Sequence, residues 1–255
     1  MASTVPSWEP LPSSIHYADI RKMNFRTGEI LYINKPYAMS SFQALAHIRF
    51  LLTRRMKYKV KVGHAGTLDP LATGVLILCT GKATKQIETL QAHTKEYVAT
   101  LQLGASTPSH DMEHPVDEVF PTSQITRERV ESLLASFVGE AVPQVPPVYS
   151  AVCVNGKRAY QLSRKGKDFE IQPKMVRIDE IELLHFDEEM MQMSIRVVCG
   201  KGTYIRSLAR DIGEQLESGA YLTSLCRTRV GDVSIDNCIT LEQFPHWLEC
   251  QHIEG

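Results

Sequence analysis

The chain has 255 residues, of which 43% are hydrophobic and 22% are charged, and its formal net charge is -1. This composition is that of a globular protein long enough to bury a core, so any contact with nucleic acid must rest on local clusters of charge. The longest uncharged apolar stretch, residues 74–80, is too short to span a membrane, and the N-terminus lacks the basic start and apolar run of a signal peptide.

The pattern of apolar residues predicts short strands that alternate with helices along the chain. The predicted strands are residues 30–33, 74–80, 96–104, 148–154, 175–186, 193–199 and 221–233. The predicted helices are residues 42–52 (capped by Ser40 or Ser41), 81–93, 126–137 and 203–216. Because loops join the strands as often as helices do, we expect an α/β (α+β) fold with a mixed, largely antiparallel central sheet and flanking helices.

A glycine-rich segment, "VGHAGTLDPLATGVLILCTGKATK" at residues 62–85, is the most informative stretch. A phosphate-binding loop is excluded, because six residues separate Gly74 from Gly81 and Ala83 follows Lys82 where a hydroxyl residue is required. Asp69 precedes a proline, which favours extended geometry, and it follows small residues that allow other chains to approach closely. The segment is therefore either a plain strand–turn–strand or the seat of a reactive carboxylate.

This segment resembles the signature of the TruB family of tRNA pseudouridine synthases. The resemblance covers roughly residues 30–233 and continues, in the family's order, through "INKPYAMSS" (33–41), "KEYVATLQLG" (95–104), "VPPVYSAVCVNGKRAYQLSRKG" (145–166), "GTYIRSLARDIG" (202–213) and "YLTSLCRTRVG" (221–231). It implies the pseudouridine synthase catalytic fold. The sequence "LATG" after Asp69 and Pro70 favours the stand-alone bacterial type over relatives that depend on a guide RNA.

The resemblance also implies a domain organisation. Residues 1–28 lie outside it and are expected to form a poorly ordered N-terminal arm. Residues 29–255 are expected to form a single catalytic domain with a thumb-like insertion around residues 143–175. The chain ends soon after Trp247, so we expect no C-terminal RNA-binding domain of the PUA type.

The conversion of uridine to pseudouridine breaks the N1–C1′ bond and joins C5 to C1′, without oxidation or hydrolysis. We therefore expect no redox cofactor, ATP or metal. The reaction needs a carboxylate beside the nucleotide, a cation that keeps it ionised, and an aromatic floor for the base. The resemblance assigns these roles to Asp69, Arg206 and Tyr97. Without it, Arg206 could be the solvated face of a helix, and Tyr97 could lie on a strand surface.

Further residues match the substrate-binding positions of the family. His64 is expected to help hold the extruded base, Tyr204 to pack near the carboxylate, and Leu225 to form an apolar wall. Arg158 and Arg164 belong to the basic stretch that resembles the family's RNA-gripping thumb. A second basic stretch, residues 49–61, holds six basic residues and no acid, and is more weakly indicated because charge runs are often merely solvated.

Four other features have structural interpretations or are left open. Lys35 and Pro36 are expected to shape a turn under the site. His110 and His114 mimic metal-ligand spacing without an H-E-x-x-H motif, which favours a solvated loop. Asp111 lies where the family has an acidic turn, and the sequence leaves open whether it fills that place. The six cysteines are scattered without a C-x-x-C pair, which indicates a reducing cytosol and argues against a zinc ribbon.

The sequence therefore predicts a cytoplasmic, monomeric tRNA pseudouridine synthase that acts on the T-loop uridine conventionally numbered 55, without a guide RNA or a membrane. One alternative is a non-catalytic tRNA-binding folding chaperone, which would have no need of Asp69. Another is a carboxylate-based hydrolase of nucleosides or glycosides, which would require a second acid across the pocket. How Asp69 acts, by attack at C1′ or by removal of a sugar proton, is left open.

Overall fold

The computed structural model describes residues 22–150, 152–154, 156–158 and 169–254. Its main feature is a 10-stranded sheet in the order β14-β1-β3-β12-β4-β11-β10-β7, with β2 paired to β3 and β13 to β12. The strands are β1 (Ile30–Lys35), β2 (Val62–His64), β3 (Thr73–Thr80), β4 (Lys95–Leu103), β7 (Gly139–Gln144), β10 (Lys174–Asp187), β11 (Gln192–Cys199), β12 (Ala220–Val230), β13 (Val233–Ser234) and β14 (Ile239–Thr240). Among these pairings, β1–β14 and β3–β12 are parallel and the others antiparallel. The predicted fold class is confirmed.

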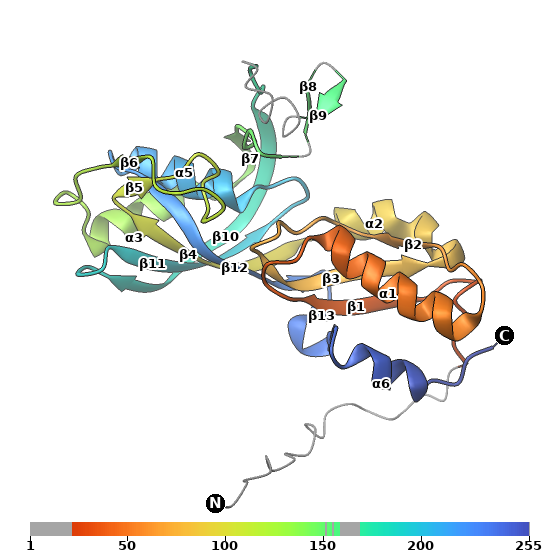
Figure 1. Cartoon of the computed structure of the whole chain (residues 1–255). Helices are drawn as coiled ribbons and strands as arrows, with labels where there is room; N and C mark the ends of the chain where they lie inside the picture. Colours follow the sequence, from red (N-terminus) through yellow and green to blue (C-terminus); the bar gives the residue numbers. More distant parts are fainter. Residues whose placement is uncertain (1–21, 151, 155, 159–168, 255) are drawn as a thin grey trace, which may run out of the picture.

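Helices flank this sheet, and two small hairpins extend from it (Figure 1). The helices are α1 (Ser41–Met56), α2 (Ile87–Ala92), α3 (Arg127–Ser136), α5 (Ile205–Gln215) and α6 (Phe244–Glu249), with 3-10 turns η1 (Gly81–Gln86) and η2 (Ile235–Asn237). The hairpins pair β5 (Ala105–Ser106) with β6 (Glu118–Val119), and β8 (Cys153–Val154) with β9 (Lys157–Arg158). Within the described part of the chain, every helix is too short or too polar to cross a lipid bilayer.

The sheet has two halves that meet along a short seam. In Figure 1, α3 and α5 lie with β4, β10 and β11 on the left, and α1, α2 and α6 lie with β1, β2 and β3 on the right. β12 joins the halves, and its pairing with β3 consists of two Cα partners, Cys226 with Thr73 and Arg227 with Gly74. We call this junction the β3–β12 seam. Each half buries its own apolar cluster.

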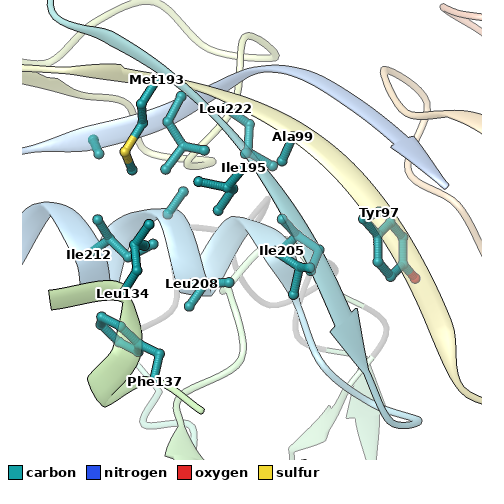
Figure 2. Close-up of a cluster of buried hydrophobic side chains, with 14 of the residues drawn as sticks. Tyr97, Ala99, Leu134, Phe137, Met193, Ile195, Ile205, Leu208, Ile212 and Leu222 are labelled. Atoms are coloured by element: carbon teal, nitrogen blue, oxygen red, sulfur yellow. The ribbon is translucent and has the colours of Figure 1, made fainter. Parts of the chain in front are cut away.

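The two longest helices form as the sequence predicts. Ser40 caps α1: its hydroxyl accepts a hydrogen bond from the Gln43 backbone amide at 3.2 Å, and its own backbone amide donates one to Gln43 Oε1 at 2.9 Å. The apolar stripe of α5, formed by Ile205, Leu208 and Ile212, is buried against the left half of the sheet (Figure 2). Burying each such side chain contributes roughly 1.5–3 kcal/mol.

Two predicted elements are only partly confirmed. Of the strand expected at residues 148–154, Cys153 and Val154 form β8, whereas residues 148–150 are irregular and the Tyr149 carbonyl accepts a hydrogen bond from the Arg206 side chain. The helix expected at residues 81–93 divides into η1 and α2. Two expected regions also extend beyond the described residues, because residues 1–21 of the arm and residues 151, 155 and 159–168 of the thumb lie outside them.

Candidate active site

The turn that carries Asp69 is tied to two neighbouring elements of the right half. The buried Ser41 hydroxyl, at the start of α1, accepts a hydrogen bond from the Leu68 amide at 2.8 Å and donates one to the Leu68 carbonyl at 2.9 Å. Lys35, fully buried at the end of β1, donates to the carbonyls of Pro36 and Pro70 at 2.8 and 3.2 Å. Both residues beside Asp69 are therefore fixed, and Lys35 has the structural place that the sequence indicated.

Burial also changes the pKa of the Lys35 ammonium. Desolvation lowers its pKa from 10.5 to about 8, the Asp69 carboxylate opposes this shift, and the Arg227 guanidinium adds to it. Because three backbone carbonyls (Pro36, Met39 and Pro70) accept hydrogen bonds from its Nζ, this side chain is committed to the turn and does not point its amine at a substrate.

Arg206 reaches Asp69 from the opposite half of the sheet. It lies in the first turn of α5, its side chain is 4% exposed, and its Nε is 2.8 Å from Asp69 Oδ2. Its terminal nitrogens donate to the carbonyls of Ser109 at 3.2 Å and Tyr149 at 3.0 Å. A second carboxylate, Asp111, lies 3.8 Å from the same Nε. Arg206 is thus buried and fully engaged, which excludes the solvated-face interpretation.

The loop that holds Asp111 packs over Arg206 through its first part, residues 109–111. The prediction of a solvated loop is wrong for that part and holds for the exposed residues 112, 113 and 115–119. Ser109 and Asp111 are 0% and 5% exposed, and the Leu222 amide donates to the His110 carbonyl at 3.0 Å. This first part is held in place because Arg206 and Leu222 of β12 donate hydrogen bonds to the carbonyls of Ser109 and His110. Burial, followed by the nearby guanidinium groups of Arg210 and Arg206, lowers the pKa of His110 from 6.5 to about 4.

His114 in the same loop stacks on Tyr149, with ring centroids 4.7 Å apart. Among the described residues, no group of three or more His, Cys, Asp or Glu side chains could hold a metal ion.

A small pocket opens beside the carboxylate, where the two halves of the sheet meet. Its walls are Asp69, Leu71, Ala72, Asp111, Met112, Arg206, Leu222, Thr223, Ser224 and Leu225. The structure therefore brings Asp69, Arg206 and Leu225 together. It also adds Asp111, whose place the sequence left open.

Tyr97 is buried rather than at a strand surface. It lies in β4, its side chain is 8% exposed, and Figure 2 shows its ring at the edge of the apolar cluster. Burial raises the pKa of its phenol, and the guanidinium of Arg227 opposes this shift. Arg227 is the cross-strand neighbour of Tyr97, and it is a buried residue that the sequence motifs did not single out.

The remaining predicted residues are less closely gathered. His64, in β2, has a buried Nδ1 without a hydrogen-bond partner in the described structure, and burial together with Arg227 lowers its pKa. Tyr204 caps α5, and its side chain packs against the small cluster of Val152 and Ile171. Like Tyr97, neither His64 nor Tyr204 is among the residues that line the Asp69 pocket.

The two arginines of the expected thumb remain untested. Arg158 is seen as part of β9, opposite Cys153. Arg164 lies outside the described residues.

A partly exposed carboxylate, fixed by a buried arginine beside a small pocket, is a site of the kind found in enzymes that use a carboxylate as nucleophile or base. Comparison with known families identifies the group. The model of the TruB family pseudouridylate synthase N-terminal domain matches residues 54–205, and that of the tRNA pseudouridylate synthase B C-terminal domain matches residues 206–253.

Known proteins agree with this match. The chain is 59% identical over 233 residues to tRNA pseudouridine synthase B of Bacteroides fragilis, covering 91% of this chain and 99% of the relative. It is 44% identical over 224 residues to the Flavobacterium johnsoniae protein of the same name, covering 87% of this chain and 96% of the relative. The chain belongs to the TruB family of pseudouridylate synthases, as its resemblance indicated.

A solved structure with a similar fold is that of a Cbf5-Nop10-Gar1 complex. The TM-score is 0.64 at 27% identity, and the match covers 88% of this chain and 55% of that chain. The present chain thus spans just over half of the length of that neighbour.

Proposed function

We propose that this protein isomerises uridine to pseudouridine in tRNA, and that its target is the T-loop uridine 55. The observation that carries the proposal is the Asp69–Arg206 pair at 2.8 Å beside the pocket, in a chain of the TruB family. The relatives named tRNA pseudouridine synthase B, which match along nearly their whole length, support tRNA as the substrate.

The proposed chemistry gives each of these side chains a role. The target nucleotide leaves the base stack and enters the pocket, which costs a few kcal/mol. Asp69 acts at the sugar, Arg206 orients the carboxylate, and Leu225 forms an apolar wall beside the base. The N1–C1′ bond breaks, the uracil turns, the C5–C1′ bond forms, and the C5 proton is lost while N1 gains one, so the product is an isomer of the substrate. Tyr97 supplies the floor for the base and a phenol that can relay the C5 proton.

We further propose that the protein acts as a monomer on the T-arm, without a guide RNA, and grips the RNA backbone through Arg158 and Arg164 of the thumb. The segment "LATG" after Asp69 and Pro70, typical of the stand-alone type, supports the absence of a guide. The arrangement of Arg206 argues against the chaperone alternative. A binding protein has no use for a buried guanidinium aimed at a carboxylate, because desolvating such a pair is costly.

The test is incubation of the purified protein with one unmodified tRNA transcript, followed by carbodiimide mapping of pseudouridine. One modified position in the T-loop, formed without added RNA, is the expected result, and Asp69→Asn is the matched control. If the protein bound the transcript and refolded it but formed no pseudouridine, the chaperone alternative would be correct. If activity required a second RNA, the guide-independent part of the proposal would fail.

A further inference from the structure

Arg227 is a buried cation at the β3–β12 seam. Its side chain, 2% exposed, is the largest among the fully buried ones. Its Nε donates to the Val75 carbonyl at 2.8 Å and one terminal nitrogen donates to the Gly66 carbonyl at 3.1 Å. These two partners are backbone carbonyls, and the guanidinium also interacts with the Tyr97 phenol, so none of these contacts supplies a compensating carboxylate.

Burying such a charged group costs free energy. Removing a cation from water costs several kcal/mol, and hydrogen bonds to two carbonyls, without a counter-charge, recover only part of that cost. Lys35, another buried cation, lies close enough for its pKa to be lowered further by Arg227. A guanidinium at this position therefore needs an explanation other than stability.

The position of Arg227 in the sheet suggests an explanation for its presence. Asp69 belongs to the right half, in the segment between β2 and β3, whereas Tyr97 belongs to the left half, in β4. Arg227 lies opposite both Tyr97 of β4 and Gly74 of β3. Its side chain ends on Gly66, three residues before Asp69. A single side chain thus links the strand beside the aromatic floor to the segment that carries the carboxylate.

The backbone of β12 and β3 around Arg227 accommodates its side chain. The register of β12 against β4 shifts between Arg227 and Arg229, and such irregularities redirect side chains beside active sites. Gly74, with φ of 101°, would place a Cβ 2.2 Å from the Arg227 carbonyl oxygen, so only glycine allows the two strands to approach this closely.

We propose that Arg227 is a positioning residue for the isomerisation, because its hydrogen bonds to Val75 and Gly66 fix the Asp69 segment relative to Tyr97 across the seam. The inference rests on the proposed function. It depends on the forked geometry of the guanidinium, which a lysine cannot reproduce, more than on the charge. A misplacement of about 1 Å can lower a rate on the order of 10²-fold.

The experiment compares Arg227→Met and Arg227→Lys with the wild type on one tRNA transcript. Single-turnover rates are measured at saturating enzyme, and tRNA Kd is measured separately. We expect the rate to fall on the order of 10²-fold for Arg227→Met and at least about tenfold for Arg227→Lys, with Kd within about threefold of the wild type. An effect on rate without an effect on Kd is the signature of positioning.

Lys95→Met is the matched control. Lys95 is also a buried cation of the sheet, 6% exposed, and its Nζ donates to the carbonyls of Gln91 and His93, away from the Asp69 segment. Its loss should lower the melting temperature and leave the rate of the folded protein within about threefold. Amide hydrogen exchange over residues 65–68 should be at least about tenfold faster in Arg227→Lys and unchanged in Lys95→Met.

The results of these measurements support or overturn the proposed role of Arg227. If folded Arg227→Lys and Arg227→Met both react within about threefold of the wild-type rate, the proposal is overturned. If Arg227→Met does not fold, Arg227→Lys decides alone, since it keeps the charge and most of the volume. If the wild type forms no pseudouridine, the proposed function fails, and hydrogen exchange still tests whether Arg227 fixes the Asp69 segment. Unchanged exchange at residues 65–68 in Arg227→Lys would show that Arg227 does not fix that segment.

Discussion

Asp69→Asn is expected to abolish isomerisation, by at least about 10⁴-fold, at a cost to the fold of only about 1 kcal/mol. The amide keeps the size of the side chain and an oxygen for Arg206, but it can neither attack the sugar nor accept its proton. The stability cost is small for two structural reasons. The Asp69 side chain is 37% exposed, so solvent already screens its ion pair, and the Asp111 carboxylate stays 3.8 Å from the Arg206 Nε.

Arg206→Met is expected to be much more damaging to the fold. It leaves the carbonyls of Ser109 and Tyr149 without their donor, and it leaves Asp69 and Asp111 without the cation between them. Each buried acceptor left unsatisfied costs about 1–3 kcal/mol, so the total should reach about 3–5 kcal/mol. The two partners of one ion pair should therefore differ by about 3 kcal/mol in their effect on stability.

The assay is urea unfolding of the wild type and both variants at pH 7, together with single-turnover pseudouridine formation by each folded protein. The double variant Asp69→Asn with Asp111→Asn is the control, because it strips Arg206 of both carboxylates and should destabilise by more than the sum of the single changes. The reasoning is refuted if Asp69→Asn destabilises as much as Arg206→Met, or if it retains turnover near that of the wild type.

Three further predictions concern the base, the RNA backbone and pH. Tyr97→Leu should suppress the single-turnover rate, because the floor and a proton relay are lost, whereas Arg164→Ala should chiefly raise KM. Reversing the charges of the exposed residues Arg54 and Arg55, at the end of α1, should weaken tRNA binding roughly tenfold and flatten its dependence on salt. Because the pKa of His110 falls from 6.5 to about 4 on folding, the unfolding free energy should decrease as the pH drops from 6.5 towards 4.

Each of these has its control. Equal losses of single-turnover rate in Tyr97→Leu and Arg164→Ala would contradict the division into reacting and gripping residues. Arg127→Glu on α3 reverses an equally exposed charge and should leave tRNA affinity unchanged, so an equal loss there would show a non-specific effect of charge. His110→Asn, which suits the local φ of 58°, should remove most of the acid sensitivity, and an unaltered pH profile would exclude His110 as its source.

The sequence predicted those helices whose signals come from residues close together in the chain. The apolar stripe of α5 and the capping residue of α1 could be read directly, since helical periodicity and N-cap chemistry depend on neighbouring residues. Asp69 and Arg206 are 137 residues apart, and their pairing was implied by the family resemblance rather than by any spacing.

The contributions that depend on tertiary packing were missed. Alternation along β12 does not reveal that Arg227 is buried, because the register shifts between Leu222 and Ser224 and again between Arg227 and Arg229. His110 has a polar sequence context, and its half-buried position depends on a tertiary hydrogen bond from the Leu222 amide of β12 to its carbonyl. The one available signal for Arg227 was an arginine within an otherwise strand-like, partly apolar run.

The position of β12 in the sheet has a consequence for how the chain is made. β12 lies between β3 and β4 although its residues, 220–230, come more than a hundred positions after theirs. Until the ribosome has released this strand, β4 presents an edge that can pair with another chain, because β12 pairs with it along its whole length. β3 depends on β12 at only two residues, Thr73 and Gly74. The nascent protein therefore carries an open β4 edge from residue 103 until residue 230 has been made. The strand that closes this edge also supplies one wall of the pocket, so closure of the sheet and assembly of the pocket occur in the same folding step.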